Sequence, residues 1–144
     1  RSIWVTGVQT CALPIYNLLL APLPTAGTFD FELDAIYSSS TTADIKFAFT
    51  IPAGAAIVWW ACGLATGASS NSGDVAFLSA TASGTSGNLG GAGTGVFTPV
   101  RFYGEVVMGG TAGNLQLQWA QANLDATDTT VRSPSTLRVW RVTP

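Results

Sequence analysis

The stretch TFDFELDAIY, from Thr28 to Tyr37, alternates apolar and polar side chains with a period of two residues. Its apolar side consists of phenylalanine, leucine, alanine and tyrosine, and the opposite side carries Asp30, Glu32 and Asp34. Successive side chains of a β-strand point to opposite faces, so this period predicts a strand with one buried face. A row of carboxylates on one strand face is typical of the solvated side and not of a catalytic set.

A second alternating stretch runs from Asp44 to Ile51, and Pro52 and Gly54 end it. The polar segment SSSTTA lies between the two stretches. A short polar connection between two alternating runs favours a hairpin, so we expect these two strands to pair with each other.

Six more segments have strand character, and none has a helical period. They are residues 17–21, 56–64, 74–80, 96–108, 114–121 and 137–142. Ala56 to Leu64 is apolar on both sides, which predicts burial between two layers or on a subunit contact. About eight short antiparallel strands separated by turn residues predict an all-β sandwich or barrel.

The segment from Ala80 to Gly95 is rich in glycine and poor in apolar residues, so we expect a long surface loop or a mobile connection. Gly91, Gly93 and Gly95 have a spacing that a pattern search associates with dinucleotide binding. That motif needs a strand before it and a helix after it, and the sequence predicts neither.

Charged residues make up 10% of the chain, against about 25% in a typical soluble domain. A surface of such low charge favours partial coverage by copies of the chain or by partners. The 6 Lys and Arg residues form no basic patch for nucleic acid. The apolar runs are short and interrupted by glycine, so we expect no membrane insertion.

The sequence contains no histidine, which excludes the commonest general base, imidazole-dependent triads and most zinc sites. Asp125 and Asp128, in NLDATDTT, are close enough for a calcium site or an acid/base pair, but Asp in such loops more often caps turns. Cys62 lies in an apolar segment and is expected to be an inert, buried thiol. We therefore expect no catalytic residue, no cofactor and no metal.

The tryptophans allow two interpretations, a sugar-stacking row or packing. Trp59 and Trp60 are adjacent, so they point to opposite faces of a strand and at most one can join an exposed row. Packing in the core or at a subunit contact is the favoured interpretation for both. The expected subunit-contact residues are Trp59, Trp60, Gln116, Gln118 and Trp119.

The first 15 residues have a different origin from the rest. Val5 to Ile15, VTGVQTCALPI, matches the translation of a common sequencing adaptor, and Arg1 fits the bases upstream. We therefore interpret residues 1–15 as an adaptor-derived artefact and residues 16–144 as one N-terminally truncated domain. Cys11 belongs to the artefact, so only Cys62 remains and no intrachain disulfide is expected.

Three segments carry a resemblance to a known family. They are FDFELDAIYSSSTTADIKFAFTIPAGA (Phe29 to Ala55), GEVVMGGTAGNLQLQWAQANLDATDTTV (Gly104 to Val131) and the terminal STLRVWRV. They resemble a domain found at the C-terminal ends of tail and other structural proteins of bacterial viruses and prophages. The resemblance implies a β-sandwich of jelly-roll type, similar to the trimeric heads of tumour necrosis factor-like proteins, displayed on a virion and without catalytic residues.

These observations favour a non-enzymatic virion domain that forms a homotrimer, joins upstream tail-fibre components and attaches to the host surface, whose glycans are candidate partners. The loops that carry Asn88, Asp125 and Asp128 are expected to face the partner. The alternative is a carbohydrate-binding module of a secreted bacterial enzyme, in which an exposed tryptophan stacks on sugar. An enzyme acting through Asp125 and Asp128 ranks below both.

Overall fold

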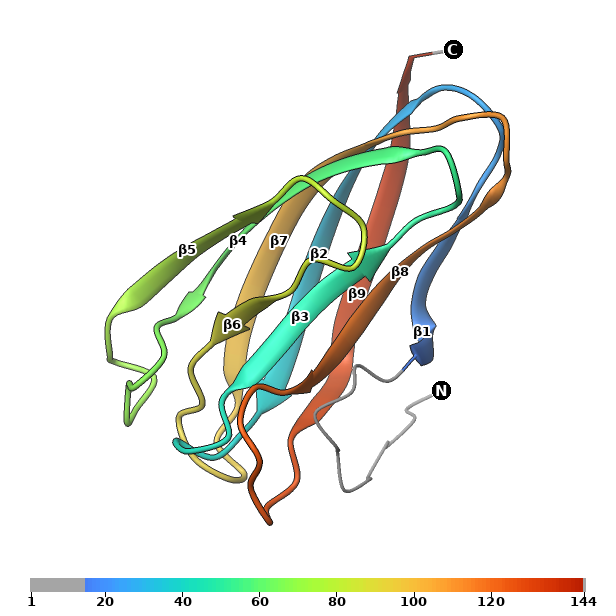
Figure 1. Cartoon of the computed structure of the whole chain (residues 1–144). Coiled ribbons are helices and arrows are strands. Elements are labelled where there is room, and N and C mark those ends of the chain that lie inside the picture. Colours follow the sequence, from blue (N-terminus) through green and yellow to red (C-terminus); the bar gives the residue numbers. More distant parts are fainter. Residues whose placement is uncertain (1–14, 144) are drawn as a thin grey trace.

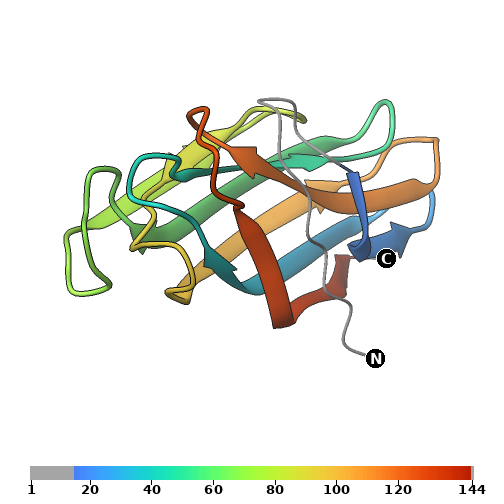
Figure 2. The same cartoon turned by 90° about the horizontal axis from the view of Figure 1, so that it is seen from below.

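The computed structural model describes residues 15–143, with side chains from Leu19 to Val142. This part of the chain forms nine strands and no helix. The strands make two antiparallel sheets that pack face to face as a β-sandwich (Figures 1 and 2). The sandwich expected from the two-residue period is confirmed. The adaptor interpretation stays a prediction, since residues 1–14 lie outside the described part.

The strands are distributed between a four-stranded sheet, in the order β1-β8-β3-β6, and a five-stranded sheet, in the order β5-β4-β7-β2-β9. Their bounds are β1 Ile15–Leu23, β2 Thr28–Ser38, β3 Ile45–Thr50, β4 Ala56–Leu64, β5 Val75–Ala80, β6 Gly87–Leu89, β7 Thr98–Val107, β8 Gly113–Gln121 and β9 Thr130–Thr143. Within the described residues only β4 and β5 form a hairpin of consecutive strands, and every other connection crosses between sheets. This winding is consistent with a jelly roll.

The predicted hairpin between β2 and β3 is wrong, because the two strands lie in different sheets. They meet through their apolar faces across the sandwich instead. The ring centroids of Phe31 and Phe49 are 5.0 Å apart, and those of Tyr37 and Phe47 are 5.7 Å apart. Alternation specifies which face of a strand is buried, and two such faces can be buried by stacking as well as by edge-to-edge pairing.

The core between the sheets is built around aromatic rings. Trp59 of β4 is 1% exposed, and its ring lies 5.7 Å from that of Phe49 and 5.8 Å from that of Phe102. Rings at such tilted and edge-on angles add about 0.5–1.5 kcal/mol per pair beyond the area they bury. Trp119 of β8 is equally buried in the opposite sheet.

The glycine-rich segment is partly ordered core, so the prediction of a surface loop from Ala80 to Gly95 is wrong for its middle. Residues 87–89 form β6, which pairs with β3, and residues 89–92 are buried. A Cβ atom on Gly90 would lie 2.0 Å from the carbonyl oxygen of Ala65, and one on Gly91 would lie 2.1 Å from that of Ser40. These glycines permit close backbone packing that no other residue allows.

Hydrogen bonds fix this segment to the end of the sandwich. The Tyr37 hydroxyl donates to the Gly90 carbonyl oxygen at 2.6 Å, and the Gly91 amide donates to Asp44 Oδ1 at 2.8 Å. Burial raises the pKa of the Asp44 carboxyl above its ordinary value, although the Gly91 amide opposes this shift.

Candidate functional site

The outer face of the five-stranded sheet exposes apolar side chains on several neighbouring strands. On β4, Ile57 and Trp59 point inward, whereas Val58 and Trp60 are exposed. The expectation that this strand is buried between two layers is therefore wrong, and the alternative, a subunit contact, stays a prediction. Cys62 lies on the same outward set and is exposed, so the prediction of a buried thiol is wrong as well. An apolar strand face is thus open to solvent in the isolated chain.

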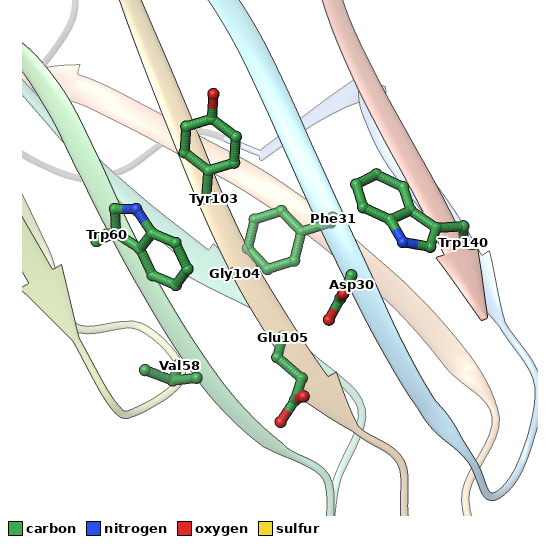
Figure 3. Close-up of a pocket in the computed structure, with 8 residues that line it drawn as sticks. All are labelled: Asp30, Phe31, Val58, Trp60, Tyr103, Gly104, Glu105 and Trp140. Atoms are coloured by element: carbon green, nitrogen blue, oxygen red, sulfur yellow. The ribbon is translucent and has the colours of Figure 1, made fainter. Parts of the chain in front are cut away.

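A hollow with a volume of about 280 Å³ lies on this face, over β4, β7, β2 and β9 (Figure 3). Its lining residues are Asp30, Phe31, Val58, Trp60, Tyr103, Gly104, Glu105 and Trp140. Trp60 and Trp140 flank it on opposite sides, and the carboxylates of Asp30 and Glu105 lie between them.

One wall of the hollow is held in place by a series of contacts. Trp60 lies directly opposite Tyr103 in the β4–β7 pairing, and their rings stack with centroids 5.8 Å apart and planes at 21°. Arg101 Nη1 donates to the Tyr103 hydroxyl at 3.3 Å, and Arg101 Nε donates to Asp34 Oδ1 at 2.5 Å. The Tyr103 ring orients Trp60 by stacking on it. Trp60 is still 42% exposed, so its ring is accessible to a ligand.

The opposite wall is Trp140 of β9, which is 48% exposed. It lies next to Asp30 in the β2–β9 pairing. β9 is the outermost strand of its sheet, so Trp140 forms the outer margin of the hollow. The two indoles therefore offer separate flat apolar surfaces on either side of a polar centre.

The polar centre is a pair of like charges. Asp30 and Glu105 are register partners in the β2–β7 pairing. Further along the same strands, Glu32 and Asp34 lie within 4 Å of Arg101 and Arg138. The guanidinium of Arg101 hydrogen-bonds Asp34 and lowers the pKa of that carboxyl, with a smaller contribution from Arg138.

The expected subunit-contact residues separate into two groups. Trp59 and Trp119 are 1% exposed and pack inside the sandwich, so they are not accessible to a second subunit and this prediction is wrong for them. Trp60 is exposed, and Gln116 and Gln118 are half-buried on the outward set of β8. The prediction that Trp59 and Trp60 face opposite sides is confirmed.

The expected partner-facing residues lie away from the hollow. Asn88 is exposed on β6 and not in a loop. Asp125 caps its turn: Oδ1 accepts from the Thr127 amide at 2.7 Å and from the Thr127 hydroxyl at 2.6 Å. These hydrogen bonds lower the pKa of Asp125. Asp128 lies in the same loop, and no metal-binding group of three His, Cys, Asp or Glu side chains occurs in residues that the structure describes.

The sequence interpretation did not select Tyr103, Glu105 and Trp140 as site residues. Their outward direction is encoded in the alternation of β7 and β9, in the same way as for Trp60. The alternation does not show which strands lie side by side, because β4, β7, β2 and β9 come from distant parts of the chain.

No protein-family model, curated protein or solved structure matches the chain. No helix among residues 15–143 is long and apolar enough to cross a membrane.

Proposed function

We propose that this protein is a non-enzymatic adhesion domain of a bacterial-virus particle, and that the hollow binds polysaccharide on the host surface. The observation that carries this proposal is the placement of two exposed indoles on either side of paired carboxylates. Aromatic rings stack on the apolar faces of pyranose rings, and carboxylates accept hydrogen bonds from sugar hydroxyls. An apolar site with a few convergent polar groups is the usual form of a ligand site.

The dimensions of the hollow suit a short length of sugar chain. Neighbouring strands lie about 4.8 Å apart, and β7 and β2 separate β4 from β9, so the backbones that carry Trp60 and Trp140 are roughly 14 Å apart. A single sugar ring does not span that width. The open, shallow shape of the hollow fits an oligosaccharide lying across the strands.

A glycan array followed by titration calorimetry tests this proposal. Trp60→Ala and Trp140→Ala are each expected to weaken binding of a retained glycan by at least about tenfold, since each removes a stacking surface. Phe97→Ala is the matched control, because Phe97 is an exposed aromatic residue directly before β7 and outside the hollow. Absence of binding to any glycan, or equal losses in all three variants, would refute the proposal.

We also propose that the domain assembles as a homotrimer through the margin of β5. β5 is the outermost strand on its side of the five-stranded sheet, and its Val75 and Phe77 are 66% and 75% exposed. An exposed apolar edge strand is a ready contact for another chain. Light scattering during size-exclusion chromatography should give three subunits, and Phe77→Asp should give one. A monomeric wild-type chain at micromolar concentration would contradict this assignment.

A carbohydrate-binding module of a secreted bacterial enzyme is the second candidate, and the same hollow favours it. The two candidates differ in assembly and not in the ligand site. A monomer that retains glycan binding would favour the module, whereas a trimer that binds glycan would favour the virion domain.

A further inference from the structure

The paired carboxylates at the centre of the hollow indicate the charge of its ligand. Asp30 and Glu105 lie directly opposite each other, a position in which Cβ atoms are about 4.5–5.5 Å apart and like charges repel. Neither carboxylate forms a hydrogen bond or an ion pair with a residue in the described range. This pair is therefore an uncompensated negative centre.

The nearest cations on the same face are engaged elsewhere. Arg101 and Arg138 both contact Glu32 and Asp34, one and two outward positions further along β2 from Asp30. The side chains directly beside the pair are Val58 next to Glu105 and Trp140 next to Asp30. The face is thus divided into a neutralised half and an acidic half. Trp140 lies in the acidic half, beside Asp30, and Trp60 lies at the boundary, in register with Tyr103 and Glu32.

We propose that the hollow selects a polysaccharide that carries protonated primary amines, an amino sugar without its N-acetyl groups. This inference rests on the proposed glycan-binding function and specifies the ligand class. An ammonium group between Asp30 and Glu105 relieves their repulsion and forms charge-assisted hydrogen bonds with them. The same cation lies beside Trp140, the register neighbour of Asp30, where cation–π attraction adds to stacking of the sugar ring.

Two other positively charged ligands fit the hollow less well. Calcium takes six to eight oxygen ligands, whereas the hollow offers two carboxylates and the described residues contain no larger metal-binding group. A lysine side chain of a partner protein would satisfy the carboxylates, but its flexible methylene stem presents no flat face to either indole. The combination of two flat aromatic walls and a negative centre favours a ring that bears an amine.

Titration calorimetry with matched oligosaccharides tests the inference. The probes are a tetrasaccharide of β-1,4-linked glucosamine, in a buffer in which its amines are protonated, and the N-acetylated tetrasaccharide of the same linkage. We expect the charged probe to bind at least about tenfold more tightly, with an affinity that falls as salt is added. The double variant Asp30→Asn/Glu105→Gln should remove that difference, whereas Asp74→Asn, which deletes an exposed carboxylate outside the hollow, should retain it.

Each other outcome identifies what is wrong. Equal binding of both probes that depends on Trp60 but not on Asp30 or Glu105 would overturn the charge inference and leave the proposed function intact. An oligolysine peptide that binds more tightly than the charged sugar, with the same dependence on both carboxylates, would overturn it in favour of a protein partner. Binding of neither probe, together with an empty glycan array, would overturn both proposals.

Discussion

Trp59 and Trp60 are joined by one peptide bond, yet one is 1% exposed and the other 42%. Trp59 packs among the rings of the sandwich core, whereas Trp60 stacks on Tyr103 at the surface. The inner face of the five-stranded sheet stabilises the fold through close packing. The outer face is held by surface contacts that contribute little to stability, so its residues are free to serve binding.

Removing the inner indole should have the largest effect. Trp59→Ala leaves a cavity among aromatic rings and should lower the free energy of unfolding by about 3–5 kcal/mol. Trp59 Nε1 has no hydrogen-bond partner in the described part of the chain, so Trp59→Phe should cost much less than Trp59→Ala. Trp60→Ala should stay within about 1 kcal/mol of the wild type. Urea unfolding measures the free energy of unfolding of all three variants. Equal losses in Trp59→Ala and Trp60→Ala would contradict the difference between the inner and outer faces.

Gly104 lies where the packing of the inner face meets the hollow on the outer face. A Cβ atom on Gly104 would lie 2.5 Å from the Phe31 ring and 2.5 Å from the carbonyl oxygen of Val58. Gly104→Ala should therefore cost about 1–3 kcal/mol by overpacking and should also weaken glycan binding, because Gly104 lines the hollow. Gly110→Ala is the control, since nothing lies within 4 Å of its added Cβ. Thermal unfolding and calorimetry on both variants would show whether stability and binding change together.

Asp44 extends the comparison to a carboxylate in the interior. Asp44→Ala would leave the buried Gly91 amide without its acceptor and should cost about 1–3 kcal/mol. Asp44→Asn keeps an acceptor oxygen and tolerates the positive φ of 49° at this position, so it should cost far less. The folded-state pKa of Asp44 is raised by burial, so its contribution to stability declines as the pH rises through that pKa. Asp44→Asn should remove this decline in unfolding measured against pH.

Asp34, on the outer face, should have the smallest effect and the opposite dependence on pH. Its folded-state pKa is lowered by Arg101, so its stabilisation is complete above the ordinary pKa and disappears as the pH falls through the lowered one. Because the ion pairs are exposed, Asp34→Asn should cost at most about 1 kcal/mol at neutral pH. Asp30→Asn should cost nothing or stabilise slightly, since it relieves repulsion by Glu105. If Asp30→Asn lowered the free energy of unfolding as much as Asp34→Asn, the division of this face into a neutralised half and an acidic half would be contradicted.

The sequence predicted the strands well but their neighbours poorly. The alternation from Thr28 to Tyr37 correctly assigned the inward and outward side chains of β2. It could not show that β2 pairs with β7 and β9 and stacks on β3, because all of these arrangements bury the same apolar face. The glycine-rich segment was misjudged for a related reason: its glycines are required by close approach of distant backbone, which no local pattern encodes.

For the candidate site too, the sequence determined some properties and the tertiary structure determined others. The sequence by itself determined an all-β chain without histidine, in which Trp59 and Trp60 face opposite sides, because the period of a strand and the chemistry of a side chain are local properties. Only the tertiary structure decided that Trp60 and Trp140 flank Asp30 and Glu105, because strand order and register are set by packing between segments far apart in the chain.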